Sequence, residues 1–120
     1  MAYRDLRQWI AKIESEGQLK RIRAEVDWDE EIGGITRKAY DMKDRCPALL
    51  FENIKGYQNG RCGKLFTASL LTYGRIAMML GLAKDASVRE IVQTVRNRIK
   101  QPVMPVLLKD GPCKENIVRG

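Results

Sequence analysis

Two glycine-containing stretches are the first candidates for chemistry, because glycine lets backbone N–H groups approach and cradle a phosphate. Gly33 and Gly34 lie within residues 31–37, and a second stretch spans residues 60–64. Neither has the Gly-x-Gly-x-x-Gly of a dinucleotide site, and the second lacks the spacing and the Ser or Thr of a Walker loop. Both are therefore interpreted as features of backbone geometry rather than as phosphate sites.

Four carboxylates gather just upstream of the glycine pair, at Asp27, Asp29, Glu30 and Glu31. Such a cluster could bind a metal ion or supply a general acid and base. The start of a helix favours negative charge through its dipole, which explains the cluster without any catalytic role. Metal binding and acid–base catalysis are not favoured here.

The three cysteines, Cys46, Cys62 and Cys113, are widely spaced, and the chain contains no histidine. No Cys-x-x-Cys pair is present, so a structural zinc site has too few ligands. A nucleophilic cysteine would need a base, and histidine is absent. We expect buried or half-buried free thiols.

The net charge of +7 is unevenly distributed along the chain. Residues 61–120 carry 11 basic and 4 acidic side chains, so the whole surplus lies in the second half. Four of these cations, Arg89, Arg96, Arg98 and Lys100, fall on the polar face of a predicted helix. Because the basic residues are dispersed and not interleaved with the tyrosines, an acidic partner surface or a neighbouring acidic domain is favoured over nucleic acid.

No catalytic, cofactor-binding or metal-ligating residue is therefore assigned within this chain. With 120 residues, 44% of them hydrophobic and 31% charged, the chain is one folded domain with a real core. No apolar run approaches the about 20 residues of a membrane span. The start of the chain lacks the apolar region of a secretory signal, so we expect the cytoplasm.

The apolar pattern of residues 1–56 predicts three elements followed by a buried strand. Asp5 and Gln8 are spaced to cap a first helix that ends at Gly17. The alternation of Ile22, Ala24 and Val26 with charged residues predicts a half-buried strand. A helix then runs to about residue 45, and residues 48–51 form the buried strand.

The helix that follows the first strand should contain Gly33 and Gly34, with Asp27 and Glu30 spaced as its capping box. Each glycine costs about 1 kcal/mol relative to alanine, so we expect another element to pass too close for a β-carbon. The alternative is a helix that begins only after Gly34.

The second half predicts a turn at residues 58–60, a strand within residues 64–69 and two more helices. Thr72 can cap the first of these helices, which Gly81 ends, and Ser87 and Glu90 form a capping box for the other. The second helix has the clearest apolar stripe of the chain: Val88, Ile91, Val92, Val95 and Ile99. Prolines then force an extended segment over residues 103–109. Interleaved helices and short strands predict an α+β fold, a small mixed sheet covered by amphipathic helices.

Read end to end, the chain resembles the N-terminal domain of the UbiD family of prenylated-flavin-dependent decarboxylases. Five motifs carry the resemblance in family order: Asp5-Leu6-Arg7-Gln8-Trp9 with Gly17-Gln18-Leu19, Val26-Asp27 with residues 31–37, residues 47–57, Arg75-Ile76-Ala77 with Leu80-Gly81-Leu82, and Gly111-Pro112-Cys113-Lys114-Glu115-Asn116. Gly34, Lys64 and Tyr73 depart from the common pattern, which leaves the subfamily and the substrate open.

The resemblance implies an enzyme that adds or removes CO2 on aromatic or α,β-unsaturated acids with prenylated FMN, Mn2+ or Mg2+, and K+. It also implies that the flavin pocket and catalytic residues lie in a following split-barrel domain. Residues 1–110 would then be the N-terminal α/β domain, and residues 111–120 the start of the connection. None of these groups is expected to bind this chain, which alone should be inactive.

Under this reading the chain is a fragment, because its apolar end suggests that it continues. Its partners would be the flavin-binding and C-terminal domains, with residues 103–108 packed on the flavin domain and a homo-oligomer formed through regions outside the chain. Two alternatives remain: an accessory subunit that works in trans with a catalytic chain, and an unrelated nucleic-acid binder.

Overall fold

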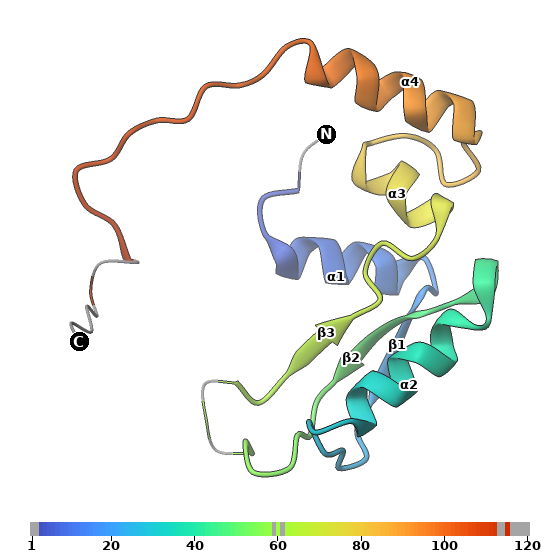
Figure 1. Cartoon of the computed structure of the whole chain (residues 1–120), viewed down its shortest axis with the longest axis vertical. Coiled ribbons are helices and arrows are strands. Elements are labelled where there is room, and N and C mark those ends of the chain that lie inside the picture. Colours follow the sequence, from blue (N-terminus) through green and yellow to red (C-terminus); the bar gives the residue numbers. More distant parts are fainter. Residues whose placement is uncertain (1–2, 59, 61, 113–114, 116–120) are drawn as a thin grey trace.

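The computed structural model describes residues 3–58, 60, 62–112 and 115. It is an α+β fold, as expected, in which a small mixed sheet has helices on both faces (Figure 1). The strands are β1 (Leu19–Ile22), β2 (Ala48–Phe51) and β3 (Leu65–Thr67), in the order β1-β2-β3. β1 is parallel to β2, and β3 is antiparallel to it.

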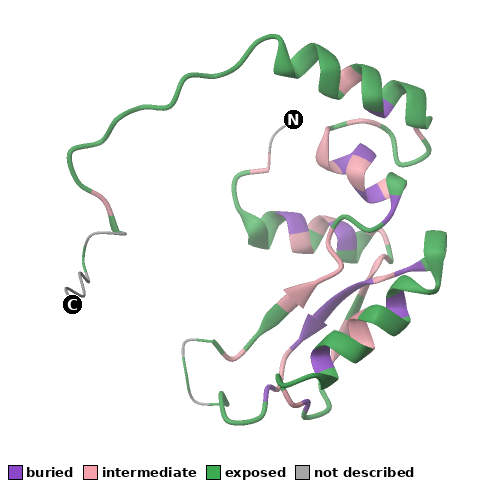
Figure 2. Ribbon diagram, viewed as in Figure 1, coloured by how far each residue is buried: buried purple, intermediate pink, exposed green. Residues whose placement is uncertain are grey.

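The central strand β2 is buried at all four positions. Leu49 and Phe51 point toward one core, which also contains Val26, Ile32, Ala39, Cys46 and Ile54. Ala48 points to the other face, where it packs with Trp9, Ile13 and Met78. Figure 2 shows this buried strand between helices that are exposed on their outer sides. Because side chains alternate across a strand, β2 supplies both cores of the sandwich.

The prediction of a strand through Ile22, Ala24 and Val26 is wrong in its position. β1 ends at Ile22, the chain bends at Ala24, which is exposed, and only Val26 returns to pair, as an isolated bridge with Ile54. The bend follows the last ladder bond, in which Glu52 N donates to Ile22 O. The alternating residues therefore belong to the end of β1 and to the bent segment that follows it, and not to one continuous strand.

The first helix, α1 (Leu6–Ser15), has the predicted ends. The Gln8 N–H donates to Asp5 Oδ1 at 2.8 Å, and Gly17 follows the helix with φ of 67°. The Gln8 side chain, however, accepts from Arg4 N rather than from the cap residue. The Asp5 cap is thus confirmed, and the reciprocal half of the box is shifted by one residue.

Helix α2 (Glu31–Tyr40) contains both glycines, so the alternative of a helix that starts after Gly34 is wrong. Close packing is also wrong, because a β-carbon at Gly33 or Gly34 would meet nothing within 4 Å. Close packing of another described segment therefore does not offset the helical cost of this pair.

The start of α2 also differs from the predicted capping box. Glu30 is the N-cap residue with φ of 59° and makes no side-chain cap bond. The reciprocal contact comes instead from Glu31, whose Oε2 accepts from Asp27 N at 2.6 Å. Glu31, the first residue of the helix, thus makes the bond to Asp27 N that was expected from Glu30.

The remaining helices are a short 3-10 helix η1 (Lys43–Arg45), α3 (Tyr73–Met79) and α4 (Val88–Ile99). Thr72 caps α3, and Gly81 follows it with φ of 76°. Ser87 and Glu90 form the predicted capping box at α4. Beyond α4, residues 102–108 form neither helix nor strand and run away from the sheet (Figure 1).

Candidate functional site

The acidic cluster before α2 makes structural contacts through Asp27. Asp27 Oδ1 accepts from Asp29 N at 3.1 Å, and Asp27 Oδ2 forms an ion pair with Lys55 at 2.9 Å. The hydrogen bond from Lys55 lowers the pKa of Asp27, so this carboxylate stays ionised. Across the residues that the structure describes, no three Cys, Asp or Glu side chains come together as a metal site would require.

The two cysteines that the structure describes, Cys46 and Cys62, do not form a site either. Cys46 is buried, and its thiol lies 3.5 Å from Pro47 O. Cys62 is exposed, so the expectation of a buried or half-buried thiol is wrong there. It lies in the loop between β2 and β3, whose described residues from 55 to 64 are nearly all exposed. Cys113 lies outside the described residues.

The glycines of residues 60–64 form part of a tight turn. A β-carbon at Gly63 would lie 3.4 Å from Tyr57 O, and Gly60 N donates to the same carbonyl. Asn59 and Arg61 lie outside the described residues. The described part of this stretch is explained by turn geometry.

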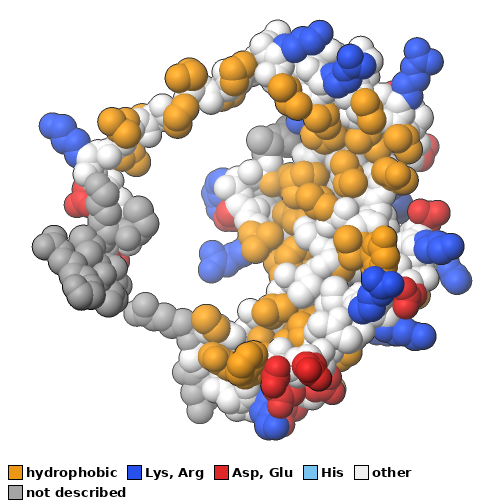
Figure 3. Space-filling model, viewed as in Figure 1, with side chains coloured by type: hydrophobic (Ala, Val, Ile, Leu, Met, Phe, Trp, Pro, Cys, Tyr) orange, Lys and Arg blue, Asp and Glu red, His pale blue; other side chains and the backbone are white. Residues whose placement is uncertain are grey.

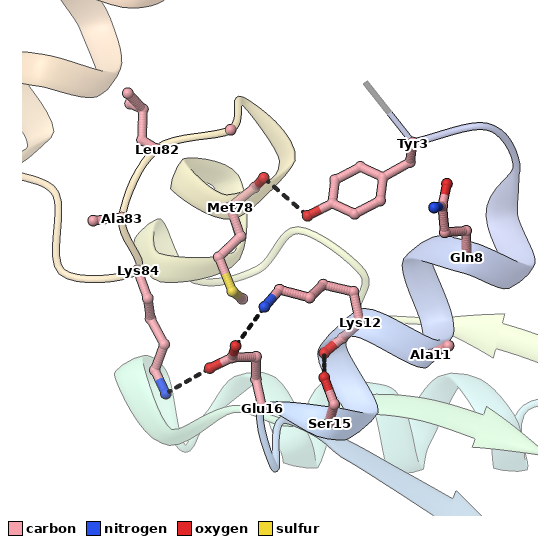
Figure 4. Close-up of a pocket in the computed structure, with 11 residues that line it drawn as sticks. Tyr3, Gln8, Ala11, Lys12, Ser15, Glu16, Met78, Leu82, Ala83 and Lys84 are labelled. Atoms are coloured by element: carbon pink, nitrogen blue, oxygen red, sulfur yellow. Dashed lines mark hydrogen bonds and ion pairs between the residues drawn. The ribbon is translucent and has the colours of Figure 1, made fainter. Parts of the chain in front are cut away.

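A groove of about 750 Å³ lies between α1 and the loop that follows α3 (Figure 4). Glu16 lies between two lysines, 2.6 Å from Lys12 Nζ and 3.8 Å from Lys84 Nζ. The hydrogen bond between Glu16 and Lys12 lowers the pKa of Glu16 and raises that of Lys12. Tyr3 Oη donates to Met78 O at 3.1 Å. Because the carboxylate and the ammonium are held in their charged forms by each other, the groove offers no poised general acid or base.

A second charged group gathers around Glu52 at the end of β2. Its carboxylate contacts Arg21 at 2.7 Å, Lys64 at 3.2 Å and Arg23 at 3.6 Å. Glu14 holds Arg21 from the other side with two hydrogen bonds. The hydrogen bond from Lys64, followed by that from Arg21, lowers the pKa of Glu52 against the opposing effect of burial. This network ties the three strands to α1 and is structural.

Arg75 is a buried cation, which the sequence analysis named only as part of a family motif. It is 1% exposed on the inner face of α3. Its guanidinium donates to four neutral acceptors: Cys46 O at 2.8 Å, Ser69 O at 2.9 Å, Ala68 O at 3.1 Å and Gln18 Oε1 at 3.3 Å. Burial lowers its pKa. Arg75 therefore joins the segments that enter β1 and β2 to the segment that leaves β3.

The apolar stripe of α4 is mostly exposed to solvent, whereas an amphipathic helix usually buries its apolar face. Val88, Val92, Val95 and Ile99 are 36–73% exposed, and only Ile91 is buried. The segment after it continues this apolar surface, since Val103, Met104, Val106, Leu107 and Leu108 are 69–99% exposed. Figure 3 shows hydrophobic side chains along both elements. A surface of this kind marks an interaction site rather than a catalytic one.

The described helices include none with the length and hydropathy of a transmembrane span. The polar contacts of the described residues likewise form no catalytic constellation. What the arrangement can do is bind another surface through α4 and the segment that follows it.

Known proteins that this chain resembles are described as carboxy-lyases or decarboxylases. The family model described as "3-octaprenyl-4-hydroxybenzoate carboxy-lyase N-terminal domain" matches residues 10–95. The chain is 39% identical to a phenolic acid decarboxylase of Bacillus subtilis and 33% identical to a pyrrole-2-carboxylic acid decarboxylase of Pseudomonas aeruginosa, over 97% of the chain and 24% of each relative.

The fold is similar to that of a solved enzyme. The vanillic acid decarboxylase of Sedimentibacter hydroxybenzoicus, in its open and closed forms, matches with a TM-score of 0.80 at 34% identity. The match covers 98% of this chain and 25% of that one. The chain thus spans about a quarter of the length of the relatives that it matches.

Proposed function

The chain belongs to the UbiD family as its N-terminal domain, and on that premise we propose that it is the support domain of a non-oxidative decarboxylase or carboxylase. The substrate class is an aromatic or α,β-unsaturated carboxylic acid. The family match over residues 10–95 is the observation that carries the proposal. The substrates of the relatives support this class, since phenolic, vanillic and pyrrole-2-carboxylic acids are all aromatic acids.

The complete enzyme would use prenylated FMN, Mn2+ or Mg2+, and K+, and would work in the cytoplasm. The residues described here do not fit a site for Mn2+ or Mg2+. They assemble no acidic or thiol cluster, and the sequence has no histidine. No step of the reaction is therefore assigned to this chain, and the groups would bind elsewhere in the enzyme.

The role of this chain would be to support the domains that carry the chemistry. The partners would be the flavin-binding and C-terminal domains of the same enzyme, and a homo-oligomer would form through those regions. The exposed apolar residues of α4 and of residues 103–108 supply a surface for such a contact. An interface gains its stability from apolar area removed from water, which is what these residues offer.

A domain exchange tests the proposal. The part of the Bacillus subtilis phenolic acid decarboxylase that aligns with this chain would be replaced by the chain itself. The chimera should release CO2 from a phenolic acid, whereas a deletion that lacks the aligned part should not. A chimera that folds, binds its cofactor and stays as inactive as the deletion would contradict the proposal.

A binding measurement addresses the cofactors separately. Purified chain 1–120 would be titrated with prenylated FMN in the presence of Mn2+ and followed by flavin fluorescence. We expect no saturable binding. Tight stoichiometric binding would place the cofactor site in this chain and overturn the support role.

A further inference from the structure

We propose that the exposed face of α4 is a docking site for an acidic amphipathic helix from the rest of the enzyme. The inference rests on the proposed function, because the occupant is assigned to the three quarters of the relatives that this chain does not span. It goes further in that it names the surface, the kind of element that binds and the charge of that element.

The spacing of the exposed residues is that of a helix–helix seam. Val88, Val92, Val95 and Ile99 follow one another at intervals of four, three and four. These are successive d and a positions of a heptad, which place their side chains within an arc of about 60° on an α-helix. β-Branched side chains at such positions have few rotamers, so they can enter a partner's holes at little entropic cost. The face is thus shaped for another helix rather than for a flat surface.

The seam is kept exposed by contacts along its g edge. Ile91 is buried, and Arg98 Nη2 donates to Leu80 O at the end of α3. The Ser87–Glu90 capping box fixes the first turn. Because α4 is fixed to the body along this side, its four exposed apolar residues cannot turn inward without breaking these contacts.

The charges beside the seam select the partner. Arg89 and Arg96 occupy e positions, one residue after each d, and Arg98 occupies a g position. Arg89, Arg96 and Lys100 take part in no ion pair within the described residues. The acidic residue of α4, Glu90, is already engaged by Ser87. Since e and g residues set partner choice in paired helices, the matching positions of the occupant should be Asp or Glu.

The same charges disfavour a second copy of this chain. In an antiparallel pair of α4 helices the e positions face each other, so Arg96 and Arg89 would meet arginine. In a parallel pair e faces g, and Arg89 or Arg96 would meet Arg98 or Ile91. Like charges repel in the first arrangement, and the second offers no opposite charge at all. The occupant is therefore a different, acidic helix.

Two synthetic helical peptides would serve as probes. Both carry Leu and Ile at a and d, and they differ only in having Glu or Lys at e and g. Each would be labelled with fluorescein and titrated with the 120-residue chain, with anisotropy as the readout. We expect the Glu peptide to bind at least about tenfold more tightly than the Lys peptide, with a preference that weakens as salt is raised.

Variants of exposed residues separate the seam from its charges. The double variant Val92→Asp/Val95→Asp should abolish binding of the Glu peptide, and Arg89→Glu/Arg96→Glu should reverse the preference. Asn97→Asp, on the opposite side of α4, is the matched control and should bind as the parent does. Far-UV circular dichroism checks that each variant remains folded. Equal binding of the two peptides, or tight binding that survives Val92→Asp/Val95→Asp, would overturn the proposal.

Other occupants and the proposed function are distinguished in parallel. Dimers of the chain that Val92→Asp/Val95→Asp dissociates, or binding to duplex DNA or anionic phosphatidylserine vesicles in preference to the Glu peptide, would also overturn the docking site. In an active chimera, Val92→Asp/Val95→Asp should lower the thermal midpoint and Asn97→Asp should not. An active chimera with unchanged midpoints would overturn the docking site alone, whereas an inactive chimera with charge-selective peptide binding would count against the proposed function alone.

Discussion

The sandwich of residues 5–81 differs from the arm, which is formed by α4 with residues 101–112, in the burial of its apolar side chains and in the pairing of its charges. In the sandwich the central strand is fully buried, and charged residues such as Glu52 and Arg21 are paired. In the arm one apolar side chain of α4 is buried, and Arg89 and Arg96 have no partner among the described residues. The sandwich encloses two cores of its own, and the arm presents an apolar face that a partner would cover.

This contrast indicates that the two regions contribute unequally to the free energy of unfolding. A helix of twelve residues is marginal alone in water, so α4 depends on its capping box and on its contacts with α3. The sandwich draws its stability from two cores that share β2. Mutations of equal size should therefore have unequal effects in the two regions.

The largest effect is expected from Phe51→Ala in β2. Phe51 is 0% exposed, and deletion of a buried phenylalanine ring costs about 3–5 kcal/mol through lost burial and a residual cavity. In the arm, Ile99→Ala should change the free energy of unfolding by less than about 0.5 kcal/mol, because Ile99 is 73% exposed. Urea unfolding followed by circular dichroism measures both. Comparable losses for the two variants would remove the distinction between the regions.

The next largest effect is expected from Arg75→Met. This change leaves Cys46 O, Ser69 O and Ala68 O without their donor. A buried acceptor that loses its partner costs about 1–3 kcal/mol, and several are lost together. Arg96→Met on the exposed side of α4 is the matched control and should be nearly neutral.

The contribution of the forked geometry of the guanidinium can be separated from that of its charge. Arg75→Lys keeps the charge but has one nitrogen in place of three, so it should recover only part of the stability that Arg75→Met loses. Full recovery by lysine would show that charge rather than geometry is what Arg75 supplies.

Local signals were sufficient for much of the fold. The caps at Asp5 and Thr72, the capping box of α4 and the buried strand after Pro47 all have their predicted places. Each depends on hydrogen bonds or burial within a few residues, which is the range over which sequence patterns are informative. The interleaving of the helices and short strands then predicted the α+β architecture as a whole.

Features that depend on distant contacts were missed. The exposure of Ala24 follows from the bend after β1, and the burial of Arg75 follows from acceptors contributed by three separate segments, at Gln18, at Cys46 and at Ala68 with Ser69. Arg75 is the one cation of a short apolar helix and belongs to the Arg75-Ile76-Ala77 motif, and both signals could have identified it. The apolar pattern of α4 predicted a helix correctly, but periodicity cannot tell a face covered by this chain from one left for a partner.

A smaller effect is expected from filling the exposed glycines of α2. Gly34→Ala should raise the free energy of unfolding by about 0.5–1 kcal/mol, because helical propensity improves and a β-carbon meets nothing within 4 Å. Gly74→Ala in α3 is the matched comparison, since its β-carbon would lie 3.0 Å from Lys84 O. It should gain less or lose stability. Thermal unfolding decides, and a larger gain at Gly74 would contradict the packing seen around both sites.

The smallest effect concerns acid, and it divides the two regions once more. The pKa values of Glu52 and Glu14 are lowered in the folded chain by hydrogen bonds, from Lys64 first at Glu52 and from Arg21 at Glu14. A carboxylate with a lowered pKa stabilises the fold above its unfolded value, about 4.3 for glutamate, and loses that contribution as the pH falls through the folded pKa. Global stability should therefore decline below about pH 4.3, and less steeply in Glu52→Gln.

The pKa of Glu90 is lowered as well, but by Ser87 within the capping box of α4. Its contribution belongs to the arm, so Glu90→Gln should leave the acid dependence of global unfolding unchanged. The local effect should appear instead in amide hydrogen exchange of the first turn of α4, which in the parent chain should lose protection as Glu90 is protonated. Because glutamine can keep the capping bond without titrating, that pH dependence should vanish in Glu90→Gln. If Glu90→Gln flattened the global acid transition as much as Glu52→Gln, α4 would unfold together with the sandwich and the two regions would be one cooperative unit.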